Sequence, residues 1–390
     1  MTRRVPPLVP RMREHAASIF GEMSTLAVET GSVNLGQGFP DTDGPQSVKD
    51  AAIRAIQDGR GNQYPPVHGL PELRRAIAEH QRRFYGIELD WTADVCVATG
   101  ASEAIVATLL ALVDTGDEVV MFAPWFDVYA AGISLANGVR REVPLTPGTF
   151  RPDVDALRAA ITPRTRLLLL NSPHNPTGVV FTREELTAIA DVVAEHDLLV
   201  ISDEVYEHIV FTGHEHVPFA TLPGMAERTV TLGSAGKSLS MTGWKVGWAT
   251  GPSDLIHAVR VVRQHMSFVS GGPFQWAVAD GLALPDEHWR SFAADMQSKR
   301  DLLSAGLIGL GFAVTPSEGT YYVTTDVGPT AYADGLAFCR DLPSRAGVVA
   351  IPQQVFHDDP TNGAPYVRWA FCKRPEVLHE ALDRLARALP

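Results

Sequence analysis

Cysteine, net positive charge and long apolar runs are all scarce in this chain. Its three cysteines, Cys96, Cys339 and Cys372, are scattered and follow no metal-ligand spacing, which excludes a disulfide scaffold and suits a reducing compartment. The formal net charge is -12, whereas nucleic acids and anionic membranes bind basic surfaces, so we expect neither as a partner. No stretch approaches the roughly 18 apolar residues that a membrane span needs.

The start of the chain shows no sign of a targeting segment. Arg3 and Arg4 are followed by Val-Pro-Pro rather than by the apolar core of a signal peptide. Together with the absences above, this predicts a soluble protein of the cytoplasm that holds no metal. At 390 residues the chain is too long for one simple core, which favours two domains.

What the sequence does contain is an alternation of short apolar runs and helical patterns. Thr182 and Glu185 form a capping box before one of these helices, which extends to about His196. Such alternation predicts an α/β fold with a mostly parallel sheet covered by helices on both faces. The apolar runs that have the length of buried strands lie at 94–98, 118–122, 166–170, 198–202 and 229–232.

The pattern changes after about residue 280, where long helical segments predict a second, smaller α+β domain. Its strands are expected near 312–315, 321–325, 348–351 and 366–371. We therefore expect three parts. They are an N-terminal arm with part of the small domain (1–45), a large domain (46–280) and the small C-terminal domain (281–390).

Glycine or polar residues lie at or just past the ends of four predicted strands. They are Gly100, Asn171, Asp203 and Ser234. In open α/β sheets ligands bind at the carboxyl edge of the strands. Four separate runs thus direct polar groups to one place, which predicts the binding site there.

Two lysines, Lys237 and Lys245, lie among glycines, small residues and tryptophans in LGSAGKSLSMTGWKVGW, residues 232–248. Small residues before Lys237 allow close approach of the backbone and leave the amine room to react; the alternative is a surface loop with two solvated lysines. The segment resembles the cofactor-lysine segment of the class I/II aminotransferases, pyridoxal-phosphate enzymes of fold type I. The resemblance implies that Lys237 forms the Schiff base, while Ser234 and Lys245 hold the cofactor phosphate.

The same resemblance gives roles to three residues that follow strands. Asp203 matches the carboxylate on the pyridine nitrogen of the cofactor, and Tyr206 and Asn175 match the donors to its phenolic oxygen. Read without the family, Asp203 is a helix N-cap, Tyr206 a half-buried tyrosine and Asn175 part of a rigid Pro-rich turn. A carboxylate beside the pyridine nitrogen keeps that nitrogen protonated.

Further cofactor contacts are implied elsewhere. Gly100, Ala101 and Ser102 enter a helix in the way of a phosphate cradle, or else form a plain strand–helix turn. Trp125 takes the family position that stacks on the cofactor ring, although an aromatic cluster is more often core. Tyr64 resembles the tyrosine that reaches the phosphate of the neighbouring subunit, which implies a homodimer with shared active sites.

Substrate contacts are implied near both ends of the chain. Arg368 lies among apolar residues of a predicted strand, where its planar guanidinium suits a carboxylate, or where its stem covers an edge strand. By resemblance it binds the α-carboxylate of the substrate, with help from Asn175 and from a backbone N–H of Gly38. Phe20 matches a residue that contacts the substrate side chain.

The likeness extends from the NLGQGFPD segment at 34–41 to Arg368 and is closest to the kynurenine/glutamine transaminase and actinobacterial N-succinyldiaminopimelate aminotransferase branch. It departs at Ser102, where kynurenine transaminases carry tyrosine, and at Phe20, where they carry tryptophan. The implied activity is ping-pong transfer of an amino group from an L-amino acid to a 2-oxo acid. The alternatives are a cysteine-conjugate β-lyase and a non-catalytic, cofactor-binding regulator.

Overall fold

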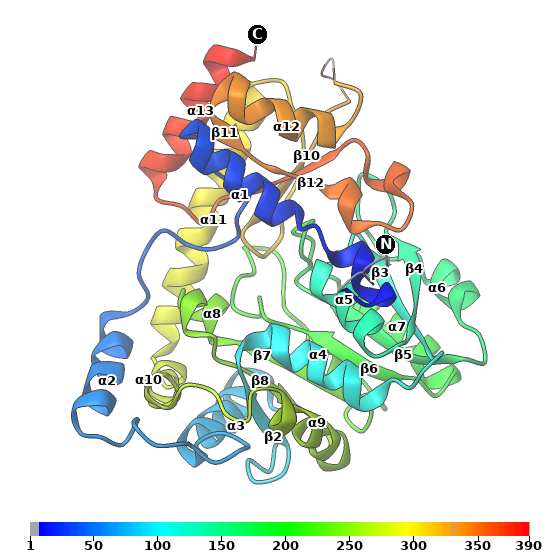
Figure 1. Ribbon diagram of the computed structural model, residues 1–390, viewed down its shortest axis with the longest axis vertical. Coiled ribbons are helices and arrows are strands. Elements are labelled where there is room, and N and C mark those ends of the chain that lie inside the picture. The colour runs from blue at the N-terminus through cyan, green and yellow to red at the C-terminus, as the bar shows by residue number, and fades with distance from the viewer. Residues whose placement is uncertain (1–7, 329, 331, 390) are drawn as a thin grey trace, which may run out of the picture.

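The computed structural model describes residues 8–328, 330 and 332–389, so the first seven residues of the expected arm lie outside the described part. Figure 1 shows a large sheet flanked by helices at one end of the molecule and a smaller sheet with α11, α12 and α13 at the other. All three cysteines are buried free thiols. Within the described residues, no helix is long and apolar enough to cross a membrane.

The large sheet has seven strands in the order β2-β8-β7-β6-β5-β3-β4. Neighbours from β7 to β4 pair in parallel, whereas β8 runs antiparallel to both β7 and β2, which confirms the expected mostly parallel sheet. Two strands, β4 and β8, were not predicted. The strands are β2 (Val95–Ala98), β3 (Glu118–Ala123), β4 (Val139–Pro144), β5 (Thr165–Asn171), β6 (Leu199–Asp203), β7 (Thr229–Ser234) and β8 (Gly247–Thr250).

Helices cover both faces of this sheet because its central strands are apolar throughout. Within β5, for example, Leu167 and Leu169 join one apolar cluster and Leu168 and Leu170 the other, as the period of a strand requires. The expected capping box of Thr182 and Glu185 is present at the start of α7. The helices are α2 (Gln46–Gln57), α3 (Pro71–Tyr85), α4 (Gly100–Leu112), α5 (Asp127–Leu135), α6 (Val154–Ala160), α7 (Arg183–Glu195), α8 (Ala235–Ser238), α9 (Ser253–Met266) and α10 (Gly272–Leu282).

The smaller sheet is antiparallel, in the order β12-β13-β10-β9. The strand expected at 348–351 is divided, because β11 belongs to a separate two-stranded sheet and β12 to this one. The elements are β9 (Ala313–Thr315), β10 (Tyr322–Asp326), β11 (Val348–Val349), β12 (Ile351–Pro352), β13 (Tyr366–Ala370), α11 (Asp286–Gly309), α12 (Gly335–Ala346) and α13 (Pro375–Ala388). Short 3-10 turns lie at Pro10–His15, Phe219–Thr221, Thr242–Trp244, Gln353–Phe356 and Pro360–Gly363.

The N-terminal segment joins the C-terminal part of the chain. Strand β1 (Val33–Asn34) pairs in parallel with β11, and the carbonyl of Leu35 accepts a hydrogen bond from the N–H of Ala370. In Figure 1, helix α1 (Ile19–Thr30) lies beside α12, with which it is in contact. These contacts bring the N-terminal segment against the C-terminal part of the chain, while the division at residues 45 and 280 stays a prediction.

Candidate active site

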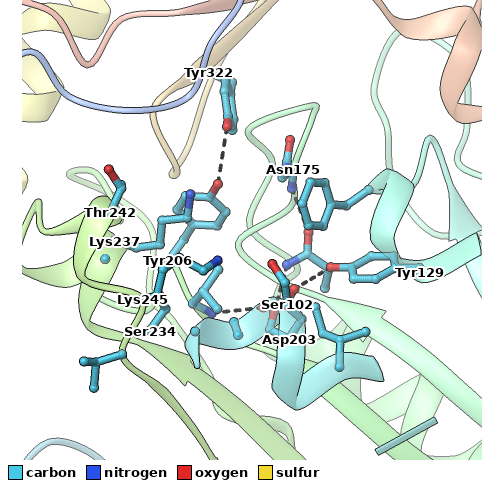
Figure 2. A pocket seen from close by; sticks show the side chains of 18 residues that line it. Ser102, Tyr129, Asn175, Asp203, Tyr206, Ser234, Lys237, Thr242, Lys245 and Tyr322 are labelled. Carbon is cyan, nitrogen blue, oxygen red and sulfur yellow. Dashed lines mark hydrogen bonds between the residues drawn. The ribbon is translucent and has the colours of Figure 1, made fainter. Parts of the chain in front are cut away.

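A cavity of about 680 Å³, its open mouth included, lies at the carboxyl ends of β5, β6 and β7. This volume is in the range of sites for small molecules. Asn171 and Asp203 are paired neighbours in the sheet and both line the cavity. Figure 2 shows most of the expected side chains around this hollow. The sequence-predicted residues in its wall are Gly100, Ala101, Ser102, Asn175, Asp203, Tyr206, Ser234, Lys237 and Lys245.

Lys237 lies in the single turn of α8, directly after β7. Its Nζ donates a hydrogen bond of 2.6 Å to Oη of Tyr321. Burial lowers the pKa of this amine to about 8, because removal from water disfavours the charged form. A lysine whose pKa is close to neutral can exist as the free amine, the form that acts as a nucleophile or a base.

Asp203 is the last residue of β6 and is buried. Its Oδ2 accepts a 2.6 Å hydrogen bond from Oη of Tyr129, and its Oδ1 a 3.3 Å bond from the N–H of Val205. Burial nevertheless raises the pKa of this carboxyl to about 6. Both of these donors are neutral. A buried carboxylate is stabilised more strongly by a positively charged N–H group, such as one on a bound ligand.

The start of α4 forms a cradle for an anion. Gly100 has φ of +77°, and a Cβ added to it would lie 3.1 Å from Nζ of Lys245. Any larger residue at position 100 would therefore fill the space beside this amine. Free N–H groups at the start of a 13-residue helix, the Lys245 ammonium and the Ser234 hydroxyl at the end of β7 together suit a phosphate dianion.

Arg368 on β13 is 1% exposed and lies over the ring of Tyr322, 4.1 Å from its centroid. Nη1 donates to Oδ1 of Asn175 at 3.0 Å and Nη2 to the carbonyl of Gly36 at 2.7 Å. Among the described residues Nε has no hydrogen-bond partner. A buried guanidinium held by neutral oxygens favours an anionic ligand, and its fork fits a carboxylate. Phe20 also packs here, with its ring centroid 5.1 Å from Cζ of Arg368.

Tyr206 and Asn175 face the same cavity from different loops, as Figure 2 shows. The hydroxyl of Tyr206 donates to that of Tyr322 at 3.5 Å. The amide oxygen of Asn175 is used by Arg368, and its backbone N–H donates to Asn171 at 2.8 Å. Because Arg368 uses the amide oxygen of Asn175, the side-chain NH₂ group of Asn175 remains to donate a hydrogen bond.

The aromatic wall differs from the expectation for Trp125. Phe126, not Trp125, lines the cavity, and the indole N–H of Trp125 donates to Oε2 of Glu142 on β4 at 3.1 Å. The physical reason is the turn from β3 into α5: Phe126 is the N-cap residue of α5, and neighbouring side chains at such a turn point in different directions. The cavity wall thus presents Phe126 where Trp125 was expected, and the stacking role stays a prediction.

Two further expected residues lie outside the wall of the cavity. Tyr64 is 81% exposed and packs edge-on against Phe268 at 5.6 Å between centroids. Gly38 lies close to the site, because a Cβ at this position would come within 1.8 Å of Oη of Tyr322. Only glycine fits there, which brings the backbone of Gly38 against the aromatic wall.

The structure also adds residues that sequence reasoning missed. Thr242 and Tyr322 line the cavity, Tyr129 binds Asp203, and Tyr321 binds Lys237. Tyr129 lies inside a helix and Tyr321 and Tyr322 at the start of a strand, where aromatic residues are usually core. Only the hydroxyl group distinguishes these tyrosines from core phenylalanines, and the sequence does not show where each hydroxyl points.

These groups fit pyridoxal phosphate. The amine of Lys237 suits an aldehyde, the buried Asp203 suits a protonated ring nitrogen, and the Gly100 cradle suits a phosphate. The buried guanidinium of Arg368, whose Nε has no hydrogen-bond partner among the described residues, suits a carboxylate. The fold and site thus define an enzyme that handles amines and carboxylates on a phosphate-bearing cofactor.

Comparison with known proteins agrees with this class. Residues 30–385 match the family described as aminotransferase class I and II. The probable N-succinyldiaminopimelate aminotransferase of Mycobacterium tuberculosis is 47% identical, over 97% of this chain and 98% of the relative. The methionine aminotransferase of Escherichia coli is 38% identical, over 97% and 98%. The solved structure of N-succinyldiaminopimelate aminotransferase from Mycobacterium tuberculosis superposes with a TM-score of 0.95 at 48% identity and covers 98% of this chain and 100% of that chain.

The chain belongs to the class I and II aminotransferase family. It is an aminotransferase with the fold of type I, and its substrates are small molecules. The family implies pyridoxal phosphate as the cofactor. Because the named relatives are aminotransferases, transamination is favoured over the β-lyase and the regulator.

Proposed function

We propose that this chain transfers an amino group between an L-amino acid and a 2-oxo acid, with pyridoxal phosphate attached to Lys237. The observation that carries the proposal is that Lys237 and Asp203 line one cavity from separate elements, while Arg368 donates a hydrogen bond to Asn175 in the wall of the same cavity. When bound, the cofactor supplies a protonated ring that accepts the electrons released at the substrate Cα.

The protein's own groups divide the remaining work. Gly100, Ala101, Ser102, Ser234 and Lys245 bind the phosphate, and Phe126 packs on the ring. The carboxylate of Asp203 keeps the ring nitrogen protonated, and hydrogen bonds from Tyr129 and Val205 hold that carboxylate in place. Tyr206 and the NH₂ of Asn175 donate to the phenolic oxygen.

Arg368 orients the substrate through its α-carboxylate, and Gly38 and Asn175 flank that group. With the carboxylate fixed, the Cα–H bond would face Lys237, whose neutral amine would take and hold the proton from Cα. The two substrates use the same cavity in turn, since one carboxylate site serves both, so the kinetics are ping-pong.

The side-chain pocket is expected to prefer apolar or long substrates to aspartate. Phe20 packs against the guanidinium of Arg368, and Arg140 and Arg340 already pair with Glu14 and Glu22. The ammonium of Lys373 lies 4.2 Å from the centroid of the Phe39 ring and donates to the carbonyl of Phe39 at 2.7 Å. The second carboxylate of aspartate would lose water without meeting a cation that has no partner inside the protein, at a cost of several kcal/mol.

A panel of amino donors tests this preference, with 2-oxoglutarate and pyruvate as acceptors. We expect kcat/KM for aspartate to be at least about tenfold below the values for methionine and glutamine. Phenylalanine and a succinylated diamino acid complete the panel, and the names of the relatives above agree with such donors. Aspartate equal to or better than both would reveal a second cation, with Arg11, Arg13 and Arg263 the first candidates.

These three arginines differ in what the structure allows them to do. Arg11 and Arg13 are exposed on the N-terminal arm. Arg263 is buried, donates to the carbonyl of Phe268 at 2.6 Å and lies 3.6 Å from a carboxylate oxygen of Glu103. Its charge is thus already used inside the protein, so the arm would be tested first.

We further propose a homodimer in which Tyr64 of one subunit serves the phosphate site of the other. The support is the high exposure of Tyr64 beside the half-exposed Phe268, an aromatic pair left open to solvent in the single chain. Tyr64→Phe should weaken cofactor binding about tenfold, the effect of removing one hydrogen bond to a charged group.

Mixing variants tests whether the site is shared. A heterodimer of Tyr64→Phe with Lys237→Ala contains one site with Lys237 and Tyr64 both intact only if the tyrosine comes from the neighbour. The heterodimer should then recover wild-type cofactor affinity and activity at one of its two sites, whereas neither variant alone does. A protein that sediments as an active monomer would exclude the shared site.

Cytoplasmic location stays a prediction.

A further inference from the structure

Tyr321 connects the reactive amine to the loop that holds the substrate carboxylate. It directly precedes β10 and is fully buried. Nζ of Lys237 lies 2.6 Å from its Oη, and Oη lies 2.5 Å from the carbonyl oxygen of Gly38. A residue next to the small sheet thus bridges α8 and the N-terminal glycine loop.

The direction of these two hydrogen bonds follows from their chemistry. The carbonyl of Gly38 can only accept, so the single hydroxyl hydrogen of Tyr321 is donated to it. Toward Lys237 the hydroxyl oxygen is therefore an acceptor, and the lysine must donate. The lone pair of the neutral amine is not used in this contact and stays available to take a proton.

The ring of Tyr321 is held firmly enough to fix this geometry. It packs edge-on against Tyr206 at 5.2 Å and against Tyr322 at 4.9 Å between centroids. The backbone carbonyl of Tyr321 also accepts from the N–H of Phe371 at 2.9 Å. Its hydroxyl therefore has a defined position relative to the cavity.

We infer that Tyr321 is the resting point of the Lys237 amine whenever that amine is not attached to the cofactor, and that it holds the lone pair ready for the Cα proton. The inference rests on the proposed function, in which Lys237 is both anchor and base. Tyr321 is a positioning residue, because it acts through Lys237.

The groups that face the Lys237 amine come from several elements. Asp203 and Cys372 favour its charged form, whereas Arg368, Lys245 and burial favour the neutral form. The Tyr321 oxygen accepts from both forms, and more strongly from the ammonium. Removing this oxygen therefore lowers the pKa of Lys237 further.

The test uses the full-length protein freed of cofactor. Brief acetylation with acetic anhydride across pH 6–10, followed by mass spectrometry of the peptide that contains Lys237, gives the titration midpoint of the amine. Tyr321→Phe should lower this midpoint by about half to one pH unit, the difference between a charged and a neutral hydrogen bond. The matched control is Tyr322→Phe, which removes a neighbouring hydroxyl that contacts Tyr206 rather than Lys237, and should leave the midpoint unchanged.

An unchanged midpoint in Tyr321→Phe, or an equal shift in Tyr322→Phe, would overturn the inference. Should Tyr321→Phe not fold, a crystal structure of the unsubstituted cofactor-free protein decides instead. Nζ of Lys237 is expected within about 3.5 Å of Oη of Tyr321, and a separation beyond hydrogen-bond distance contradicts the resting point. Failure of the proposed function is recognised separately, because then borohydride leaves no cofactor on Lys237 while the titration can still be measured.

Discussion

Replacing Lys237 with alanine is expected to lower kcat by about 10⁴-fold or more. The change removes both the covalent anchor and the base that moves the Cα proton. Cofactor should still bind, because the phosphate site proposed at Gly100, Ser234 and Lys245 does not include Lys237. Single-turnover absorbance of the cofactor with methionine measures the loss, and equilibrium dialysis measures the retained binding.

Lys245→Ala is the matched control, since it removes the other amine of residues 232–248. It should weaken cofactor binding yet leave Lys237 competent. Borohydride reduction of the unsubstituted protein, followed by peptide mapping, should place the cofactor on Lys237. Label on Lys245, or wild-type turnover in Lys237→Ala, would reject the assignment.

Asp203→Asn is expected to reduce kcat by about 10³-fold while making the cofactor-free protein more stable. An asparagine cannot hold the charge of the protonated ring nitrogen, which accounts for the loss of rate. Its single amide oxygen can replace Oδ1 and accept from the N–H of Val205, while its NH₂, in place of Oδ2, can donate to the hydroxyl oxygen of Tyr129. The gain in stability follows from the cost of ionising a buried carboxyl.

The sign of that gain can be worked out from the pKa of Asp203. Burial raises it from 3.8 to about 6, so between these values the folded state binds more protons than the unfolded state. The stability of the cofactor-free protein therefore falls as pH rises through this window. At pH 8 the penalty is at most about 3 kcal/mol, from 1.4 kcal/mol per pKa unit, and Asp203→Asn removes it.

Urea unfolding of the cofactor-free proteins at pH 4, 6 and 8 measures this effect. Asp155→Asn is the matched control, because that acid has a side chain 99% exposed and should give no comparable gain. If Asp203→Asn loses stability at pH 8, or keeps the same pH dependence as the unsubstituted protein, then the buried carboxylate is not strained in the way described.

The alternation of apolar runs was sufficient to predict the sheet, because strands buried on both faces are continuously apolar. β4 was missed because it is an edge strand and its sequence, VRREVP, carries three charged residues. β8 was missed because its four residues, GWAT, begin inside the glycine-rich lysine segment and end two residues beyond it. In both cases the neighbouring strand, not the local pattern, makes the segment a strand.

In the candidate site, too, some residues could be predicted from the local sequence and others depend on tertiary packing. Lys237, Asp203 and Gly100 follow strands, so their shared edge could be predicted from the sequence. The choice between Trp125 and Phe126 depends on how one turn directs two adjacent side chains. Tyr321 lies directly before β10 of the other sheet, and only tertiary packing brings its hydroxyl to Lys237.

The pairing of the two ends of the chain has a consequence for how the enzyme is made in the cell. Gly36 and Arg368, which meet at the carboxylate site, are 332 positions apart in the sequence. At about 5–20 residues per second, a ribosome needs roughly 15–65 seconds to cover that distance. The large sheet is complete by Thr250. Lys237 and the Gly100 cradle can therefore assemble on a nascent chain in which Arg368, the proposed carboxylate-binding residue, has not yet been synthesised. Substrate recognition is the last property that synthesis confers.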